Sequence, residues 1–266
     1  MRRLRTPSAR ATRLAFIVAL AAGVATSFAA RHACAQSFQS EADIVEGNHR
    51  YRSPQHFAFE LRFGPYRPGI DSEFNGSRTP YQDYFGSGGK LLTQIELDYE
   101  FFHRVGSLGV GLGAGFFQVT GNAPVASGTG MITADTSQLR ILPFSASLVY
   151  RFDYFLETRN FPLVPYAKVG LDYAYWRITD GNGDVATDGR GGRGAGGTLG
   201  WHGAAGIALV LDWLDPEAAH DFDADLGVNH TALVFEFNHA DISGLWMSNR
   251  LHVGDDTWSL GLMMQF

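Results

Sequence analysis

Three features are missing or scarce in most of this chain. Beyond residue 35 it has no cysteine, because the single cysteine of its 266 residues is Cys34. No apolar run in that part reaches the length of about 18 residues that a membrane-spanning helix needs. Without disulfides or spanning helices, the chain must be stabilised by side-chain packing or by strands that cross a bilayer.

Basic residues are also scarce beyond residue 35. Residues 1–35 hold six of the 21 basic residues and none of the 27 acidic ones, which leaves 15 basic residues and a formal charge of −12 for the rest. Such an acidic balance argues against nucleic-acid partners.

Residues 1–35 themselves have the composition of a secretory signal peptide. Met1–Arg13 carries five arginines and no acid, Leu14–Ala30 is apolar, and Ala33-Cys34-Ala35 supplies small residues. We therefore expect export and cleavage after Ala35. A membrane anchor is the alternative, although the apolar run is shorter than the ~20 residues that a spanning helix needs.

Alternation of apolar and polar or small residues dominates the remaining chain. A period of two indicates strands, and helical periodicity is absent from these segments. Residues 36–56 are polar and unpatterned, which predicts a periplasmic leader, and residues 57–266 form the predicted barrel. Its eight strands are expected at 57–63, 91–101, 108–120, 138–152, 166–178, 199–213, 231–238 and 257–266.

The connections favour a transmembrane barrel over a soluble β-sandwich. Long, polar loops at 65–90, 121–136, 179–198 and 239–256 alternate with shorter links at 103–107 and 153–165. Long outer loops and short inner turns are typical of eight-stranded antiparallel barrels in outer membranes. The link 214–230 is an exception, because it is long and acidic on the inner side, and Asp215-Pro216 predicts that a short helix begins there.

The last strand carries a second signal. One face of this strand is expected to carry Trp258, Leu260, Leu262, Met264 and Phe266. This pattern resembles the C-terminal signal that delivers bacterial outer-membrane proteins to the barrel assembly machinery. The resemblance implies that machinery, and outer-membrane lipid, as partners.

The polar faces of the strands predict a charged lumen. An eight-stranded barrel is just wide enough for side chains to fill it, so opposite charges there are expected to pair in a structural ion network. Because acids outnumber bases, two functional interpretations also remain open, a polar conduit and a set of catalytic carboxylates. The predicted lumen residues are Glu60, Arg62, Glu96, Asp98, Glu100, Arg151, Lys168, Asp172, Asp212 and Glu236.

Other local patterns give weaker expectations. A phase change at Pro143 predicts a bulge. Asp180, Asn182, Asp184 and Asp188 have oxygen ligands at calcium-loop spacing, but a hairpin tip at Asn182-Gly183 explains them better, and no metal or cofactor is expected. His239 and Ser243, near Asp241 and Glu236, could serve a hydrolase if they converged with an acid.

Several motifs resemble an outer-membrane β-barrel family found in myxobacteria and their relatives. They are Phe57-Ala58-Phe59-Glu60, Gly64-Pro65-Tyr66, Leu97-Asp98-Tyr99-Glu100, residues 227–243 and residues 255–266. The resemblance implies a small barrel of the general OmpA, OmpX and OmpW architecture with no catalytic residues to carry over.

The sequence therefore predicts a non-enzymatic outer-membrane barrel with a structural or surface-interaction role. Two alternatives stay open. A narrow transporter of small apolar molecules would need a lateral pocket, for which the glycines of residues 108–120 could provide the lining. A lipid A-modifying hydrolase would need His239, Ser243 and an acid to meet at the outer rim.

Overall fold

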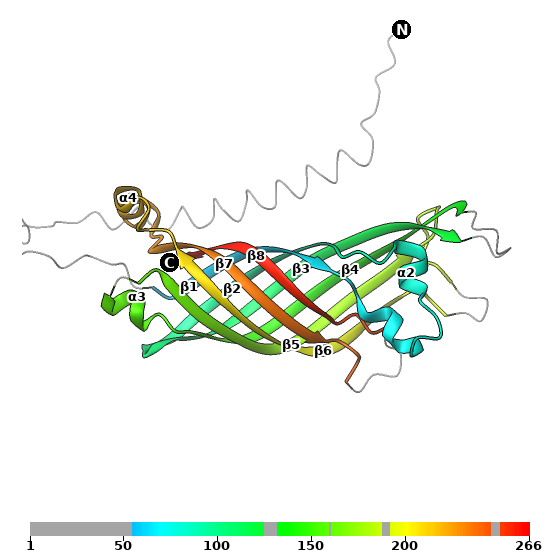
Figure 1. Cartoon of the computed structure of the whole chain (residues 1–266), viewed down its shortest axis with the longest axis horizontal. Coiled ribbons are helices and arrows are strands. Elements are labelled where there is room, and N and C mark those ends of the chain that lie inside the picture. Colours follow the sequence, from blue (N-terminus) through cyan, green and yellow to red (C-terminus); the bar gives the residue numbers. More distant parts are fainter. Residues whose placement is uncertain (1–54, 125–131, 160, 188–191, 246–250) are drawn as a thin grey trace, which may run out of the picture. The chain divides into compact units, whose positions relative to one another are not determined.

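The strands form a closed antiparallel barrel in which every strand pairs with its neighbours in sequence and β8 pairs with β1 (Figure 1). The computed structural model describes residues 55–124, 132–159, 161–187, 192–245 and 251–266. The strands are β1 (Phe57–Tyr66), β2 (Lys90–Arg104), β3 (Gly106–Pro124), β4 (Ile132–Arg151), β5 (Leu163–Thr179), β6 (Ala195–Val210), β7 (His230–Asp241) and β8 (Asp255–Gln265). All eight predicted strands and the closed eight-stranded barrel are confirmed. The predicted signal peptide and most of the leader lie outside the described residues.

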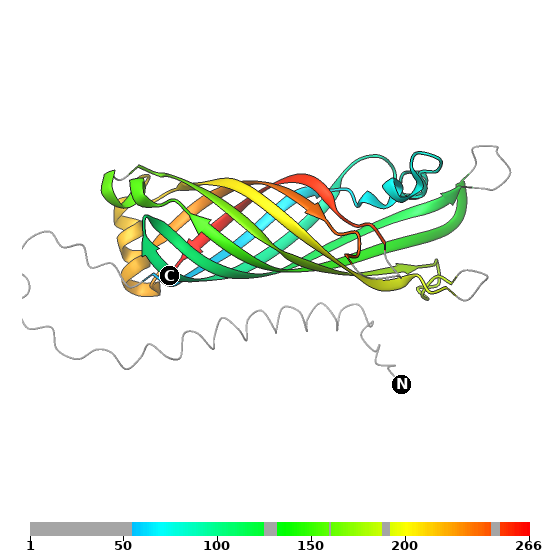
Figure 2. The same cartoon turned by 90° about the horizontal axis from the view of Figure 1, so that it is seen from below.

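The barrel has two different ends (Figure 2). At the loop end, the β1–β2 connection carries the 3-10 helix η2 (Gly69–Phe74) and the helix α2 (Pro80–Phe85). At the terminal end lie the start of β1, the end of β8, α3 (Tyr154–Arg159) and α4 (Pro216–Leu226). None of the described helices is long and apolar enough to cross a bilayer.

Alternating residues of each strand separate into an outer apolar face and a buried inner face. In β1, Phe57 and Phe59 are exposed, while Ala58 and Glu60 are fully buried. The predicted faces of this strand are therefore confirmed. Exposed apolar side chains continue around the barrel and include Phe63, Ile95, Leu97, Val110, Leu112, Phe144, Leu148, Val169, Leu171, Ile207, Leu233, Phe235, Phe237, Leu260 and Leu262.

The predicted bulge at Pro143 is wrong. The pairing of β4 with β5 runs without a shift from Gln138 to Arg151. Leu139 and Ile141 are fully buried, and Phe144 is exposed, as one uninterrupted alternation requires. The apparent change of phase arises because the inner face of β4 is apolar near the loop end and polar farther along.

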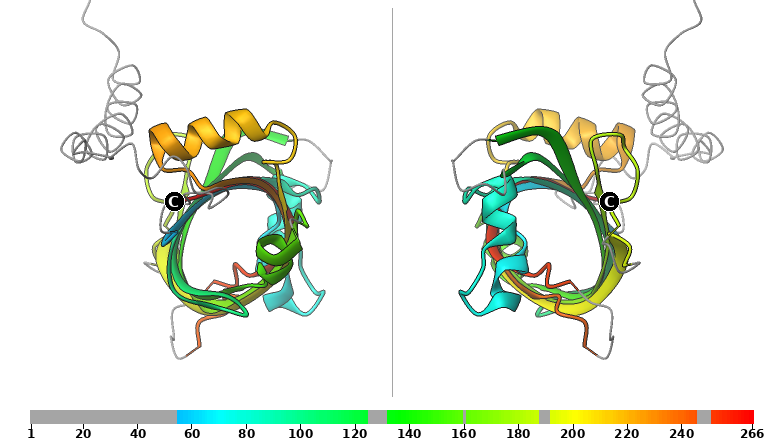
Figure 3. Two further views of the ribbon diagram at one scale, coloured as in Figure 1. Left: turned by 90° about the vertical axis from the view of Figure 1, so that its left-hand side faces the viewer. Right: turned by 90° about the vertical axis from the view of Figure 1, so that its right-hand side faces the viewer.

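Buried side chains fill the two ends of the barrel with apolar clusters. The loop-end cluster consists of Tyr66, Ile70, Tyr81, Leu92, Phe117, Val119, Leu139, Ile141, Ala174, Trp176, Ile242 and Val253. The terminal cluster consists of Ala58, Leu156, Val164, Tyr166, Ala208, Val210, Ala232, Val234 and Met263. Polar side chains occupy the middle of the inner faces between these clusters. The ring of strands around them is seen along its axis in Figure 3.

The seam between the first and last strands is closed by backbone hydrogen bonds. The N–H of Phe57 donates to the carbonyl of Phe266 at 2.9 Å, and the N–H of Phe266 donates back at 2.8 Å. Phe266 therefore extends the pairing of β8 with β1 by one more residue.

The predicted helix in the long acidic link is confirmed as α4. The Asp215 carboxylate accepts a bond from the N–H of Ala218 at 3.1 Å, and Pro216 occupies the first turn. Gly227 ends the helix in a left-handed conformation, with φ of 69°. These are the capping roles that Asp, Pro and Gly favour at helix ends.

Candidate functional site

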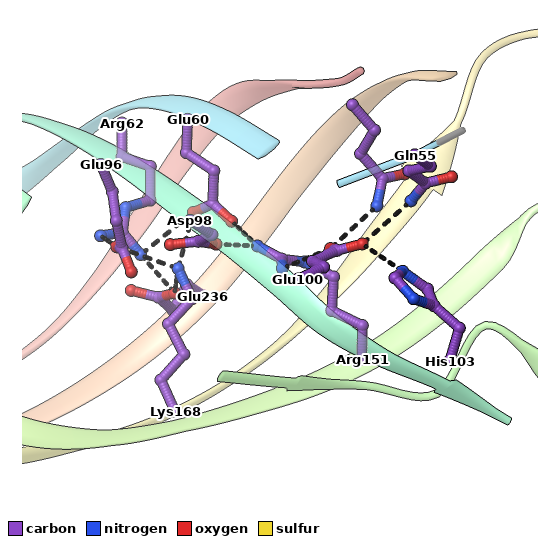
Figure 4. A network of polar contacts seen from close by, with 11 residues as sticks. Gln55, Glu60, Arg62, Glu96, Asp98, Glu100, His103, Arg151, Lys168 and Glu236 are labelled. Carbon is purple, nitrogen blue, oxygen red and sulfur yellow. Dashed lines mark hydrogen bonds and ion pairs between the residues drawn. The ribbon is translucent and has the colours of Figure 1, made fainter. Parts of the chain in front are cut away.

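Arg151 is the centre of one half of the lumen ion network (Figure 4). Its guanidinium lies 2.7 Å from Glu60 Oε1 and 2.9 Å from Glu100 Oε1, and it also pairs with Asp98. These residues come from β1, β2 and β4 and are almost completely buried. One cation thus contacts three carboxyl groups that the barrel holds away from water.

Lys168 and Arg62 complete the other half of the network. Lys168 Nζ lies 2.7 Å from Glu60 Oε2 and 3.0 Å from Glu96 Oε2. Arg62 pairs with Glu96 and Glu236, and lies 3.4 Å from Glu60 Oε2. Glu60 joins the two halves, since it contacts all three cations.

The structure thus brings together eight of the ten predicted lumen residues, with five carboxyl groups around three cations. At its terminal-end side the network reaches Glu100, which accepts from Gln55 Nε2 at 3.2 Å and contacts His103 Nε2 at 3.3 Å. The contacts hold every cation between two or more carboxylates. Such an arrangement fixes side chains and leaves little room for a mobile ion.

Glycines of β3 make space for this network. A Cβ atom on Gly111 would lie 2.3 Å from Asp98 Oδ1 and 2.7 Å from Glu96 Oε1, and one on Gly113 would lie 2.3 Å from Ser145 Oγ. Their inner side is therefore occupied by polar side chains. Gly111 and Gly113 thus adjoin polar side chains, and not the apolar pocket that the transporter alternative would need. A cavity of about 20 Å³ beside Gly113 and Asp172 has room for about one water molecule.

Asp172 faces the lumen but belongs to a separate cluster. Its Oδ2 lies 2.9 Å from His202 Nδ1, and His202 Nε2 lies 3.2 Å from Ser147 Oγ. The order of contacts is that of a Ser-His-Asp triad. All three side chains are more than nine-tenths buried inside the closed barrel, so the cluster has no exposed serine to meet a substrate. Sequence reasoning missed this cluster because it depends on the register of β4, β5 and β6.

Asp212 lies outside the lumen network, contrary to the prediction. The strand β6 ends at Val210, two residues earlier than Asp212. Asp212 Oδ2 contacts His230 Nδ1 at 2.5 Å, and its other oxygen accepts from the N–H of Thr231 at 3.4 Å. Asp212 thus anchors the turn after β6 to the start of β7.

A surface pocket of about 770 Å³ opens at the loop end. We call it the loop-end pocket; its lining includes Ser72, Glu73, His239, Asp241, Ser243, His252, Asp255 and Asp256. It is rich in carboxylates, although the described residues contain no group of three or more side chains placed to hold a metal ion.

The two candidate hydrolase residues both line this pocket without forming a catalytic pair. His239 contacts Asp256 and lies edge-on to Trp201, with ring centroids 5.4 Å apart. Among the described residues, no hydrogen bond joins it to Ser243. In this pocket the hydroxyl of Ser72 lies 2.5 Å from His252 Nδ1, but this hydroxyl donates to the carbonyl of Gly69 at 2.6 Å.

Asp255 has an unusual environment beside the loop-end pocket. Burial raises the pKa of its carboxyl group from 3.8 to about 6, although the backbone N–H groups of Arg67 and Asp256 act in the opposite direction. The Arg67 N–H donates to Asp255 Oδ2 at 2.7 Å. The carboxyl group therefore changes charge within a physiological range of pH.

The loop at Asp180 is a hairpin turn. Asp180 Oδ1 accepts from the N–H groups of Asn182 and Asp184, both at 3.0 Å, and Gly183 has a φ of 86°. The carboxylate oxygen thus stabilises the turn itself, as Asp often does. Asp188, the last residue of the calcium-like spacing, lies outside the described residues.

The predicted assembly-signal residues lie along one side of β8. Trp258, Leu260, Leu262 and Met264 are exposed on the outer face, and Phe266 is partly exposed beside Phe57. Trp258 also stacks on Phe235 of β7, with ring centroids 6.3 Å apart. These apolar side chains are thus available on the barrel surface.

No protein-family model matches the sequence, and no curated protein matches it. Among solved structures, the chain is similar to Ail, the attachment invasion locus protein of Yersinia pestis (in complex with the heparin analogue sucrose octasulfate), with a TM-score of 0.37 and 12% identity over 80% of this chain and 97% of that one. The chain is also similar to Neisserial surface protein A, with a TM-score of 0.41 and 11% identity over 80% of this chain and 97% of that one. For the N-terminal β-barrel domain of Pseudomonas aeruginosa OprF, the TM-score is 0.38 and the identity is 13% over 80% of this chain and 98% of that one. Similarities of this size assign the chain neither a family nor a ligand.

Proposed function

We propose that this chain is an outer-membrane β-barrel of a bacterium, with a closed lumen and a non-enzymatic surface-interaction role at its loop end. The apolar outer face of the barrel supports the membrane assignment. Its exposed Phe, Leu, Ile and Val side chains surround the strands, whereas soluble proteins rarely expose contiguous apolar patches of more than a few hundred Å². Lipid is the environment that such a surface requires.

The observation that carries the functional part of the proposal is the filled lumen. The loop-end cluster is buried at one end, and the ion network occupies the middle with every cation held by carboxylates. A continuous water path would require these layers and the terminal cluster to move. We therefore assign the barrel to membrane structure and surface contact rather than to transport.

The loop-end pocket is the concave surface at which we expect a partner to bind. Its carboxylates, including Glu73 and Asp256, favour cationic or hydrogen-bond-donating groups. Export through residues 1–35, periplasmic placement of the terminal end and delivery to the assembly machinery by Phe266 belong to the same proposal. In this orientation the pocket faces the cell exterior.

The membrane assignment can be tested by heat-modifiability in outer-membrane fractions. We expect the unboiled chain to migrate faster than the boiled chain on a detergent gel, because a folded barrel stays compact. Removal of Phe266 deletes both hydrogen bonds that it makes with Phe57, so the fast band should become weaker. Asp225→Ala on the exposed helix α4 is a matched control that should leave the band unchanged. A single unshifted band in the soluble periplasm would contradict the proposal.

A further inference from the structure

The helix α4 has two different faces and buries neither of them. Ala218, Phe222 and Leu226 are spaced four residues apart, and so are Glu217, Asp221 and Asp225. Residues four apart lie above one another on a helix, so the first set forms an apolar stripe and the second an acidic stripe. Phe222 is 51% exposed and Leu226 is 65% exposed. An apolar stripe of this kind lacks a partner within the described barrel.

The position of α4 shows which surroundings this stripe meets. Along the barrel axis, the helix lies outside the ring of strands and runs across the view (Figure 3). The side view also shows it crossing the axis at the terminal end (Figure 2). In a membrane that surrounds the barrel, a helix with this direction lies parallel to the bilayer plane and on the lipid side of the wall.

Exposed apolar side chains occur both on the barrel strands and in the link that leads from β6 to this helix. Ile207 of β6 and Leu233 of β7 belong to the outer face of the strands. Between β6 and α4, Trp213 is 57% exposed and Leu214 is 62% exposed. Tryptophan is the residue type that membrane proteins favour at the boundary between lipid and water. The link after β6 therefore extends the outer apolar face of the barrel to the start of α4.

The ends of α4 are fixed, so its faces cannot turn freely. Asp215 caps the first turn, and the N–H of Val228 donates to the carbonyl of Phe222 at 3.2 Å beyond the last turn. Asp212 and His230 join the start of the link to β7, and the N–H of Asn229 donates to the carbonyl of Gln265 in β8. Both ends of the link are thus tied to the barrel.

We propose that α4 is an interfacial helix that inserts its apolar stripe into the phospholipid leaflet around the terminal end of the barrel. Phe222 and Leu226, with Trp213 and Leu214, enter the boundary between headgroups and acyl chains, and the acidic stripe remains in water. The helix carries Glu217, Asp221, Asp223 and Asp225 and no Lys or Arg. Binding therefore depends on apolar burial and favours zwitterionic lipid over anionic lipid. The inference rests on the proposed membrane location.

Site-directed spin labelling of the full chain in phosphatidylcholine vesicles tests this inference. In a Cys34→Ser background, Phe222→Cys and Leu226→Cys carry the label on the apolar stripe. Asp221→Cys and Asp225→Cys are matched controls on the acidic stripe, one residue away from each. Leu112→Cys, at a position that is 71% exposed on the outer face of β3, reports whether the barrel is in lipid.

Collision rates with dissolved oxygen and with a water-soluble nickel chelate give the readout. We expect labels at Phe222 and Leu226 to resemble the label at Leu112, with a ratio of oxygen to nickel collisions several-fold higher than at Asp221 and Asp225. Anionic phosphatidylglycerol in the vesicles should lower that ratio at Phe222 and leave it unchanged at Leu112. Each variant must first show the heat-modifiable band of a folded barrel.

Each other outcome identifies what failed. If all four labels on α4 meet nickel equally while Leu112 does not, the helix lies in water and the inference is wrong, although the membrane assignment stands. If Leu112 also meets nickel, the membrane assignment itself fails. If the labels at Phe222 and Leu226 are shielded from both reagents, a protein surface or a second copy covers the stripe, and lipid is not its partner.

Discussion

At the scale of one residue, Gly111 of β3 leaves space for the ion network in the lumen because it has no side chain. Asp98 occupies the space that a Cβ atom on Gly111 would need, and Asp98 is held by Arg151. We expect Gly111→Ala to lower the free energy of unfolding by about 1–3 kcal/mol, as overpacking of a filled core usually does. Urea unfolding in lipid vesicles measures the change.

The matched control for this prediction is Gly203→Ala on β6. A Cβ atom there would meet nothing nearer than Trp201, at 3.9 Å. The control should leave the unfolding midpoint nearly unchanged. Equal stability of the two variants would mean that Asp98 moves aside without loosening its ion pair.

Arg151 allows a second test at the same scale. Its replacement by Met removes the cation that Glu60, Asp98 and Glu100 share, and breaking a buried ion pair costs about 3–5 kcal/mol. Addition of Asp98→Asn and Glu100→Gln should restore part of the loss, because fewer charges then remain uncompensated. Unfolding of the single and triple variants gives the comparison.

Arg140 provides the control for Arg151. It lies on the same strand but is exposed, and its guanidinium binds Gln118 at 3.0 Å. Arg140→Met should change stability little, since exposed polar contacts contribute little. If Arg151→Met proved equally mild, the lumen would have to admit water or counterions to the carboxylates.

The raised pKa of Asp255 predicts that the stability of the folded chain depends on pH. Its pKa is about 6 in the folded chain, against an ordinary value of 3.8. The folded state therefore binds the proton more tightly than the unfolded state does, and the contribution of this group to stability falls as pH rises from about 4 through 6. Carboxyl NMR of the folded chain should show a midpoint near 6, and Asp255→Asn should remove both the signal and its share of the pH dependence. A midpoint near 4 would contradict this prediction, because burial would then not raise the pKa of Asp255 above its ordinary value.

At the scale of one element, α4 depends on its N-terminal cap. Asp215→Ala removes the acceptor for the N–H of Ala218 and should destabilise the helix by about 1 kcal/mol. Amide hydrogen exchange should then become faster in the first turns of α4, while exchange in β6 and β7 stays slow. Asp225→Ala is the control, because an acidic residue in the last turn gives no cap and opposes the helix dipole. If exchange in the first turns were the same in both variants, the cap would not be what holds the helix.

The strands were predictable because one face of each meets a different medium from the other. Alternation in Phe57–Phe63 is enough to place both faces, and Asp215-Pro216 is enough to place the start of α4. The same rule fails where the lumen itself is apolar. Leu139 and Ile141 face inwards in the loop-end cluster, so their hydrophobicity led to the wrong prediction of a bulge at Pro143. The period of two does not show whether an apolar residue faces lipid or a plug.

The partners of polar residues were less predictable than their faces. Ser147, Asp172 and His202 come from three strands, and only the register of those strands brings them together. Asp212 has the correct phase for the lumen, but β6 ends before it. Strand ends and cross-strand register depend on the closed barrel, so a single strand's sequence does not contain them.

At the scale of the whole molecule, the filled lumen predicts that the barrel does not conduct ions. Reconstitution of the heat-modifiable form in planar lipid bilayers should give no steady single-channel steps above the leak of lipid alone. Boiled protein is the control for detergent and contaminants. Regular steps that disappear on boiling would show that the loop-end cluster or the ion network opens, and would contradict the surface-interaction proposal.

The order of the lumen layers, with the ion network between the loop-end cluster and the terminal cluster, determines what an engineer could make from this barrel. Small residues in place of Phe117 and Ile141 in the loop-end cluster would create a cup that opens to the outside and has a charged floor. Neutral, small residues in the ion network would instead create a chamber beneath an apolar lid. Neither change alone yields a pore, because each leaves the other layers of the lumen in place. A sensor that reports a captured molecule without leaking ions could be built on the first of these forms.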